Sequence, residues 1–391
     1  MFGWELPPFN SGGLGTACYG LTKSLAKKNI EITFVLPRKV PLHFNFLKLV
    51  FGDNDIFFSE SRLYTAYSTK NKINFNLIPN KNDFKLHSLI DEVNHYAEIA
   101  ERIVKTENFD IIHAHDWLTF KAAIVAKKIS KKPLVVHIHA TEFDRTGGNN
   151  CNQQVYEIEK QGMEKADLVI TVSDFIRRKV IEKYFIDPKK VVTVHNGAEF
   201  ESYELEKASE MSKRNKVVLF LGRLTIQKGP DYFIYAAKKI IEHMDNVIFL
   251  VVGSGDMENF LMEKTAELGI SDKVFFTGFL RGNDLIKAFQ MADVYVMPSV
   301  SEPFGLTPLE SLHCKTPVII SKQSGVSEVL NHCLKVDFWN INEMANKIIS
   351  VLNYPCLKEH LTENGLKEAK TITWDKSAEK CINIYNRFLN K

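Results

Sequence analysis

The sequence lacks the cysteine patterns of disulfide-bonded and zinc-binding proteins and the long apolar runs of membrane proteins. Its six cysteines are Cys18, Cys151, Cys314, Cys333, Cys356 and Cys381. They form no C-x-x-C pair and no metal-ligand spacing, which argues against a disulfide framework and a zinc site. No apolar run reaches the roughly 18 residues that a membrane-spanning helix needs, and no secretory signal opens the chain. We therefore expect a soluble, cytoplasmic protein with no integral membrane segment.

A strong charge of one sign is also lacking. The 391 residues include 50 basic and 47 acidic side chains, a formal charge of +3, so a nucleic-acid partner is not indicated. One basic segment, KAAIVAKKISKK (121–132), has the composition of a helix that touches an anionic membrane. Lysines spaced in this way more often form a solvated helix face, and weak peripheral membrane contact stays an open alternative.

Short runs rich in Val, Ile and Phe recur along the chain and alternate with longer amphipathic stretches. This pattern is typical of βα units around a parallel sheet with helices on both faces, so the predicted fold class is α/β. The candidate strands are residues 30–37, 110–116, 134–139, 167–173 and 190–197 in the first half, and residues 216–224, 246–255, 273–280, 293–299 and 317–321 in the second half. The length also fits two domains.

The charged stretch 198–215 lacks strand alternation and is the natural linker between two doubly wound domains, over residues 1–197 and 216–372. Because such sheets bind ligands at the carboxyl ends of their strands, two of them facing each other form a cleft. Only a few residues precede Pro7, so the first strand would lack most of its usual length of about five to six residues. Either the start lies further upstream or this strand is short. The tail 373–391 is predicted to be a helix with an apolar side made of Trp374, Ala378, Cys381, Ile382, Tyr385 and Leu389.

SEPFGLTPLESL (301–312) follows a predicted strand and places Glu302 and Glu310 eight positions apart across a loop that enters a helix. It resembles the E-x7-E signature of the family-4 retaining glycosyltransferases, which include glycogen synthases, sucrose synthases and mannosyltransferases. The resemblance implies that Glu302 meets hydroxyls of the donor sugar and Glu310 meets the ribose of its nucleotide. It further implies that the intervening backbone approaches the diphosphate, at Phe304, Gly305, Leu306 and Thr307. A lone glutamate pair is more often a first-turn helix acid and a solvated loop charge, but the full string favours the glycosyltransferase.

GRLTIQKG (222–229) places Arg223 and Lys228 in the first loop of the second domain and resembles the R-x4-K element of the same family. Arginine offers a rigid fork to a phosphate and lysine a mobile point charge, so together they can neutralise a departing diphosphate. They would take the place of a metal ion, and we expect no metal and no cofactor. For any lone R-x4-K, a surface Arg and Lys that frame a turn would be the better interpretation.

Glycines also lie where strands lead into helices. Gly12 and Gly13 in NSGGLGTA (10–17) can bring backbone amides close to a phosphate, as the opening loop does in glycogen synthases. A tight turn is the alternative. GSGDME (253–258) begins like a dinucleotide fingerprint but has Glu258 in place of the third glycine, so Gly253 is predicted to lie in a turn near the donor. DND (53–55) imitates a D-x-D metal motif, and exposed turn acids in an irregular stretch are the preferred interpretation.

Histidines mark two strand ends of the first domain, in HAHDW (113–117) and HIHATEFD (137–144). By resemblance His139 is the histidine beside the donor sugar, and His115, Asp116 and Trp117 line the acceptor side. Histidine would serve as a hydrogen-bond partner and not as a nucleophile. A metal interpretation of the histidines is disfavoured because no acidic ligand cluster accompanies them. The histidines at 113 and 137 are expected to be structural.

The resemblance covers nearly the whole chain and implies the GT-B architecture, with an acceptor-side first domain, a nucleotide-sugar-binding second domain and a C-terminal helix that crosses back to the first. The implied reaction moves a hexosyl group from ADP-glucose or UDP-glucose to a glucan or other sugar acceptor, with retention. No carboxylate nucleophile is evident near His139, which fits attack on the same face from which the diphosphate leaves. The alternatives are a donor such as GDP-mannose, a UDP-sugar epimerase, and a catalytically silent sugar-binding module.

Overall fold

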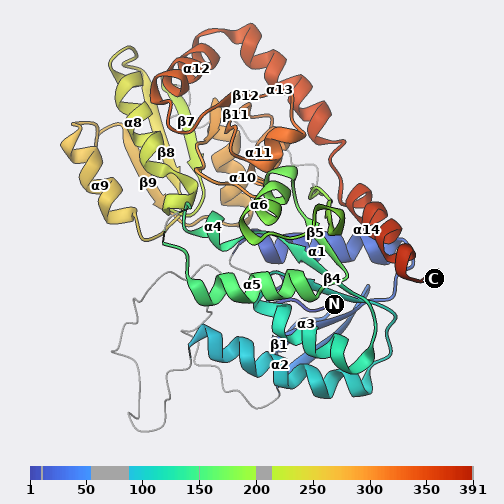
Figure 1. Ribbon diagram of the computed structural model, residues 1–391. Helices are drawn as coiled ribbons and strands as arrows, with labels where there is room; N and C mark the ends of the chain where they lie inside the picture. Colours follow the sequence, from blue (N-terminus) through green and yellow to red (C-terminus); the bar gives the residue numbers. More distant parts are fainter. Residues whose placement is uncertain (10–11, 54–87, 149, 200–213, 390–391) are drawn as a thin grey trace.

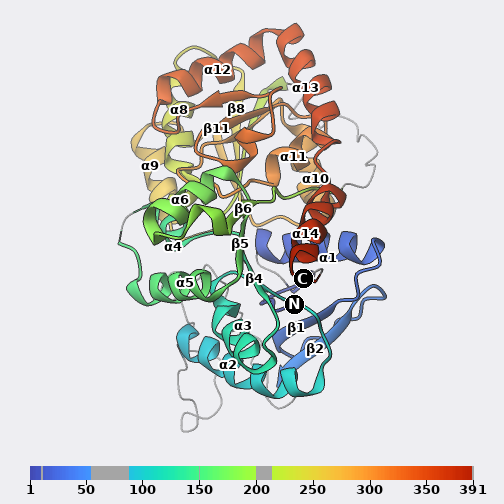
Figure 2. The same ribbon diagram turned by 45° about the vertical axis from the view of Figure 1, so that its right-hand side comes forward.

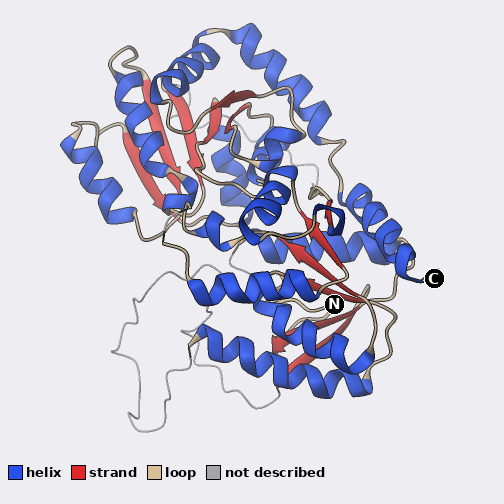
Figure 3. Ribbon diagram, viewed as in Figure 1, coloured by secondary structure: helices blue, strands red, loops and turns tan. Residues whose placement is uncertain are grey.

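Parallel strands form the centre of each half of the chain, and helices flank them (Figure 3). The structure is a computed structural model, and it describes residues 1–9, 12–53, 88–148, 150–199 and 214–389. All strand pairs within the two halves are parallel, and each half is a Rossmann-like unit. The predicted α/β class and two-domain architecture are therefore confirmed. Most of the expected linker, residues 200–213, lies outside the described residues.

The N-terminal half contains a two-stranded and a four-stranded parallel sheet. The strands are β1 (Thr33–Arg38), β2 (Lys48–Asp53), β3 (Ile112–His115), β4 (Leu134–Ile138), β5 (Leu168–Thr171) and β6 (Val191–Thr193). The first residues of the chain join the two sheets, because Phe2 forms bridges with both Val35 of β1 and Ala114 of β3. Gly3 is needed beside this bridge, since a Cβ there would lie 2.2 Å from the ring of Phe34.

Helices cover both sides of this sheet (Figure 2). They are α1 (Gly13–Lys27), α2 (Leu89–Thr106), α3 (Trp117–Ser130), α4 (Glu142–Arg145), α5 (Gln153–Lys165) and α6 (Asp174–Tyr184). Every residue of β3, β4 and β5 is buried, as expected for strands enclosed on two faces. Local sequence sets helix boundaries: Ser88 and Asp91 form a capping box that begins α2.

The C-terminal half has one six-stranded sheet of order β12-β11-β10-β7-β8-β9. Its strands are β7 (Lys216–Leu221), β8 (Val247–Val252), β9 (Val274–Gly278), β10 (Val294–Met297), β11 (Val318–Ser321) and β12 (Leu334–Val336). Its helices are α8 (Pro230–Ile241), α9 (Glu258–Glu267), α10 (Gly282–Met291), α11 (Thr307–His313), α12 (Ile341–Asn353) and α13 (Pro355–Ala369). The strand order reverses at β7, which places a topological switch point beside the loop after that strand.

The last helix, α14 (Trp374–Leu389), lies against α1 of the N-terminal half (Figures 1 and 2). The packing is close at Gly20, where a Cβ would lie 2.3 Å from the indole Nε1 of Trp374. The predicted helix and most of its apolar side are confirmed, but Leu389 is 48% exposed because it stands at the helix end. None of the described helices is long and apolar enough to cross a membrane.

All ten predicted strands are present, and two further strands, β2 and β12, were not predicted. Both lie at sheet edges, and β12 has only three residues, so periodicity alone does not reveal them. Asp53 ends β2, which corrects the expectation that the DND segment lies in an irregular stretch. The other two residues of that segment, at 54 and 55, lie outside the described residues. The basic segment 121–132 lies largely within α3, as a helix interpretation requires.

Candidate functional site

A cavity of about 520 Å³ lies between the two halves of the chain and is lined by residues of both. From the N-terminal half it receives Gly12, Gly13 and His139; from the C-terminal half it receives Arg223, Lys228, Gly253, Glu302, Phe304, Gly305, Leu306, Thr307 and Glu310. The structure thus brings together every residue that the sequence assigned to catalysis or to donor binding. The C-terminal lining residues follow β7, β8 and β10, at the carboxyl ends where doubly wound sheets bind ligands.

Lys228 and Glu302 form an ion pair in the wall of this cavity. Lys228 Nζ lies 2.5 Å from Glu302 Oε2, and the Glu302 side chain is only 8% exposed. Ser299 Oγ donates a second hydrogen bond to the same oxygen at 3.3 Å. The lysine ends a 3₁₀ turn, Ile226–Lys228, and Gly229 follows with a φ of 62°, which a glycine adopts without strain. A cation and an anion are therefore placed side by side where a polar ligand would bind.

Arg223 is held by the same turn. Its guanidinium donates to Gln227 Oε1 at 3.3 Å, and Gln227 Nε2 donates to the carbonyl of Ser301 at 3.2 Å. Gln227 is buried, and its own carbonyl accepts from Val300 N at 3.0 Å. One buried amide therefore connects the loop of Arg223 and Lys228 to the loop that begins with Glu302.

Glycine at 305 shapes the loop between the two glutamates. Gly305 has a φ of 101°, in the left-handed region, and a Cβ there would lie 3.2 Å from Glu302 Cγ. The loop leads directly into α11, whose first turn carries Glu310. Burial raises the pKa of the Glu310 carboxyl to about 7. Among the described residues its carboxylate has no hydrogen-bond partner, so it is available to accept from hydroxyls.

The loop of Glu302 is anchored to the N-terminal half as well. Ser173 Oγ donates to the carbonyl of Pro303 at 2.6 Å, and Lys179 Nζ donates to Ser301 Oγ at 2.6 Å. Ser301 in turn donates to Asp144 Oδ1 at 2.6 Å. Burial opposes ionisation of Asp144, but Lys179 and the hydroxyl of Ser301 lower its pKa. These contacts fix the position of the glutamate loop relative to the N-terminal half.

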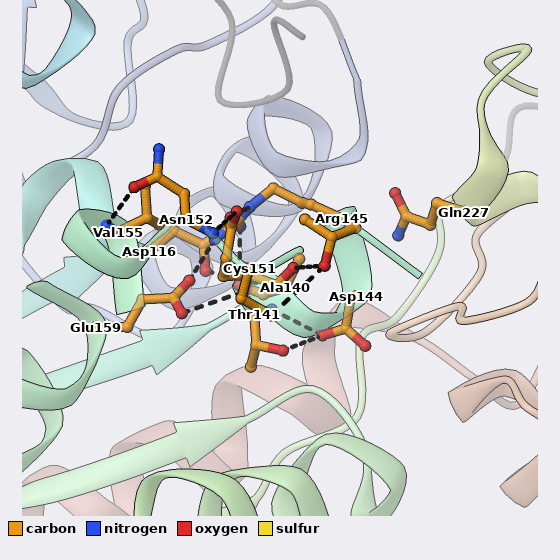
Figure 4. Close-up of polar contacts among 12 residues, drawn as sticks. Asp116, Ala140, Thr141, Asp144, Arg145, Cys151, Asn152, Val155, Glu159 and Gln227 are labelled. Atoms are coloured by element: carbon orange, nitrogen blue, oxygen red, sulfur yellow. Dashed lines mark hydrogen bonds and ion pairs between the residues drawn. The ribbon is translucent and has the colours of Figure 1, made fainter. Parts of the chain in front are cut away.

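Asp144 belongs to a polar cluster around the start of α4 (Figure 4). Thr141 and Asp144 form a capping box at the start of α4, and Arg145 donates to the carbonyl of Ala140 at 3.1 Å. Arg145 also forms ion pairs with Glu142 and with Glu159. The guanidinium is thereby compensated by two carboxylates, and this cluster supports the segment that follows His139.

His139 lies at the cavity with only 7% of its surface exposed. Burial lowers its pKa to about 3, so the ring is neutral at physiological pH. Its Nε2 lies 3.0 Å from His115 Nδ1. Two further hydrogen bonds continue behind it, from His113 Nε2 to His137 Nδ1 at 3.2 Å and from His113 Nδ1 to Tyr385 Oη at 2.6 Å. The neutral ring suits His139 to hydrogen bonding, while His113 and His137 are buried behind it.

The residues predicted to line the acceptor side do not line the cavity. His115, Asp116 and Trp117 are at most 3% exposed and lie in the core behind His139. Asp116 Oδ1 accepts from the backbone N of His139 at 2.6 Å, and burial raises the pKa of this carboxyl to about 7. The prediction for these three residues is therefore wrong in its placement. His115 ends β3, Asp116 and Trp117 follow it, and all three side chains are buried.

Sequence reasoning also missed residues that line the cavity. The loop between β9 and α10 contributes Phe279, Leu280 and Arg281, the start of α10 contributes Gly282, and the N-terminal half contributes Asn196. The loop follows the carboxyl end of a predicted strand, which is the signal that could have identified it. Asn196 comes after β6 in the same way.

Two family models match the chain. The model described as Glycosyltransferase Family 4 matches residues 11–202, and the model described as Glycosyl transferases group 1 matches residues 202–368. An uncharacterized glycosyltransferase of Methanocaldococcus jannaschii is 29% identical over 98% of this chain and 97% of its own length. The glycogen synthase of Mycobacterium tuberculosis is 25% identical over 84% of this chain and 79% of its own.

Solved structures of similar fold include two with high coverage. Sucrose-phosphate synthase of Thermosynechococcus elongatus superposes with a TM-score of 0.73 at 19% identity, over 97% of this chain and 94% of that one. HepE of Anabaena, solved with UDP and glucose, superposes with a TM-score of 0.71 at 18% identity, over 97% and 98%. At 18 to 19% sequence identity, these similarities support a shared fold only.

Proposed function

This chain belongs to the family-4 glycosyltransferases of GT-B fold, and from that premise we propose that it transfers a hexosyl group with retention from ADP-glucose or UDP-glucose to a glucan or another sugar acceptor. The observation that carries the proposal is the convergence of Arg223, Lys228, Glu302, Glu310 and His139 on one cavity of about 520 Å³. A nucleotide sugar is large and polar, and this cavity offers it both charges and hydrogen-bonding groups.

The donor is proposed to lie along the C-terminal half. Glu302 accepts from hydroxyls of the transferring sugar, and Glu310, further along the same loop and helix, accepts from the ribose hydroxyls. The backbone between them, at 304–307, faces the diphosphate, with Gly12 and Gly13 opposite. Gly253 closes the base of the site, where a Cβ would lie 1.9 Å from the carbonyl oxygen of Gly222.

Departure of the diphosphate is proposed to need no metal ion. As the sugar bond breaks, negative charge grows on the leaving phosphate, and positioned cations are worth most at that moment. Lys228 and Arg223 are the cations of the cavity wall that the family pattern assigns to this role. The buried partners Glu302 and Gln227 hold them in place before the donor arrives, which limits the reorganisation that the transition state requires.

Retention is proposed to follow from attack on the face that the diphosphate leaves. Glu302 and Glu310 are the carboxylates that line the cavity among the described residues, and Glu302 is already engaged by Lys228. Asp116 is buried and holds the backbone of His139. Because Glu302 is paired with Lys228 and Asp116 is buried behind His139, neither is assigned as a nucleophile, and the departing phosphate oxygen is the base that takes the proton of the acceptor hydroxyl. His139, kept neutral, hydrogen-bonds to the sugar.

The choice of glucose is supported by the named relatives, because one is a glycogen synthase and HepE was solved with UDP and glucose. The test is a thermal-shift screen of ADP, UDP and GDP with their glucose and mannose conjugates. A ligand at 100 times its Kd stabilises the folded protein by about 2.7 kcal/mol. The best donor is then incubated with glucan, and the anomeric configuration of the product is read by NMR. An inverted product, or stabilisation by GDP-mannose alone, would overturn the corresponding part of the proposal.

A further inference from the structure

Cys18 lies beside the two histidines nearest the cavity. It is fully buried in α1, and its sulfur and one ring nitrogen each of His115 and His139 all lie within 4.8 Å of one another. The three residues come from α1, from β3 and from the segment after β4, so only the fold brings them together. We call this group the Cys18 site. No part of the proposed transfer uses its thiol.

The donor set of the Cys18 site is that of a thiophilic divalent cation. One thiolate and two imidazoles are ligands that Zn²⁺ and Cd²⁺ prefer. In a tetrahedral zinc centre, neighbouring ligand atoms stand about 3.3 to 3.8 Å apart, as bond lengths of about 2.0 to 2.3 Å require. His115 Nδ1 and His139 Nε2 are already 3.0 Å apart, so small side-chain shifts would bring three ligands to one ion.

The surroundings provide a second, independent observation. Asp116 Oδ2 is buried with no hydrogen-bond partner in the part of the chain that the structure describes. Buried polar atoms of this kind are uncommon and point to an interaction with a group that is not part of the protein. Asp116 and Glu5 also lie close enough to Cys18 to act on its sulfur electrostatically. A divalent cation would be stabilised by both carboxylates.

We propose that Cys18, His115 and His139 form an inhibitory site for a thiophilic divalent cation such as Zn²⁺. The cation enters through the cavity that His139 lines, and the thiol proton leaves to solvent by the same route. Coordination turns the His139 ring away from the donor sugar, so the cation and the nucleotide sugar compete. A water from the cavity that His139 lines completes the coordination.

Cadmium binding tests the site without any need for transfer activity, since thiolate–Cd²⁺ coordination gives an ultraviolet charge-transfer band. The wild type is expected to bind one Cd²⁺ per chain with this band, and Cys18→Ala to lack it. Cys314→Ala is the matched control, because Cys314 is also buried but lies in the C-terminal half. An equal band in Cys18→Ala and in the wild type would overturn the proposal.

A second measurement covers the case in which Cys18→Ala does not fold. One equivalent of Zn²⁺ is added to the wild type, and the ring resonances of the histidines are followed by NMR. The signals of His115 and His139 should shift and those of the exposed His360 should not. Unchanged His115 and His139 signals would refute the site.

The proposal that the bound cation inhibits transfer rests on the proposed function. Equimolar Zn²⁺ should lower transfer by the wild type at least tenfold, reversibly with chelator, and should leave Cys18→Ala active. Cadmium binding with no loss of transfer would refute inhibition while leaving the cation site in place, and absence of transfer in metal-free protein would refute the proposed function alone.

Discussion

Replacing Lys228 by methionine removes the charge of the lysine but keeps most of its apolar stem. In the absence of the nucleotide sugar, this leaves the carboxylate of Glu302, whose side chain is 8% exposed, with Ser299 Oγ at 3.3 Å as its remaining hydrogen-bond donor among the described residues. Removing one partner of a buried pair costs about 3 to 5 kcal/mol. Because the lysine side chain is 22% exposed and the serine contact persists, we expect a loss of about 2 kcal/mol in the free energy of unfolding.

The catalytic effect of Lys228→Met should be larger than its effect on folding. A positioned group that stabilises charge in the transition state is typically worth about 10²- to 10³-fold in kcat. We therefore expect kcat with saturating donor to fall by about this factor. Nucleoside diphosphate affinity should fall too, because the proposed role of the lysine is to contact the diphosphate.

The double variant Lys228→Met/Glu302→Gln separates the two effects. With both charges removed, no buried carboxylate is left unpaired, so most of the lost stability should return while transfer stays low. Urea unfolding and steady-state kinetics of the wild type, Lys228→Met, Glu302→Gln and the double variant measure the changes in stability and in transfer. Lys322→Met is the matched control, since Lys322 pairs with Asp337 at 2.8 Å with 48% and 26% of the side chains exposed, and the variant should change stability by less than about 1 kcal/mol. Retention of wild-type kcat within about threefold in Lys228→Met would refute the leaving-group argument.

Four further outcomes are expected. Transfer should persist in excess chelator, and a loss of activity that magnesium or manganese restores would contradict the metal-independent charge pair. Glu302→Ala should lower kcat far more than it raises donor KM, whereas Glu310→Ala should act mainly on donor KM, by about 1 to 3 kcal/mol, because ribose does not react. The raised pKa of Glu310, about 7, means that the folded state keeps a proton that the unfolded chain releases near pH 4.3. Protonated Glu310 contributes to the free energy of unfolding below about pH 4, and this contribution is lost as the pH rises to about 7. In urea titrations at several pH values, the stability of Glu310→Gln should therefore decline less over this range than that of the wild type. Parallel pH profiles of the two proteins would refute the raised pKa. Gly20→Ala should destabilise the protein by about 1 to 3 kcal/mol, because its Cβ would meet the Trp374 indole at 2.3 Å; an unchanged melting temperature would show that α14 does not pack as described.

The sequence by itself determined the class of the fold and most of the donor cavity. Strands that are buried on both faces must be continuously apolar, so β3, β4, β5 and their counterparts are visible as short Val- and Ile-rich runs. Residues that follow such strands collect at one edge of a sheet. Together with the resemblance of their two motifs to the family pattern, this position after predicted strands assigned Arg223, Lys228, Glu302 and Glu310 to one site before the fold was known.

Only the tertiary structure decided which strand-end residues reach the cavity and which turn into the core. His139 and Asp116 both follow a strand of the N-terminal sheet, yet one lines the cavity and the other holds its backbone from behind. Nothing local distinguishes them, because the direction of each side chain depends on how the next helix packs. The same holds for Cys18, which periodicity identifies only as an apolar helix position. Its place beside His115 and His139 depends on the packing of α1 against the sheet, and that packing is set by contacts distant in sequence, among them the bonds from Phe2 to β3 and the contact of α14 with Gly20.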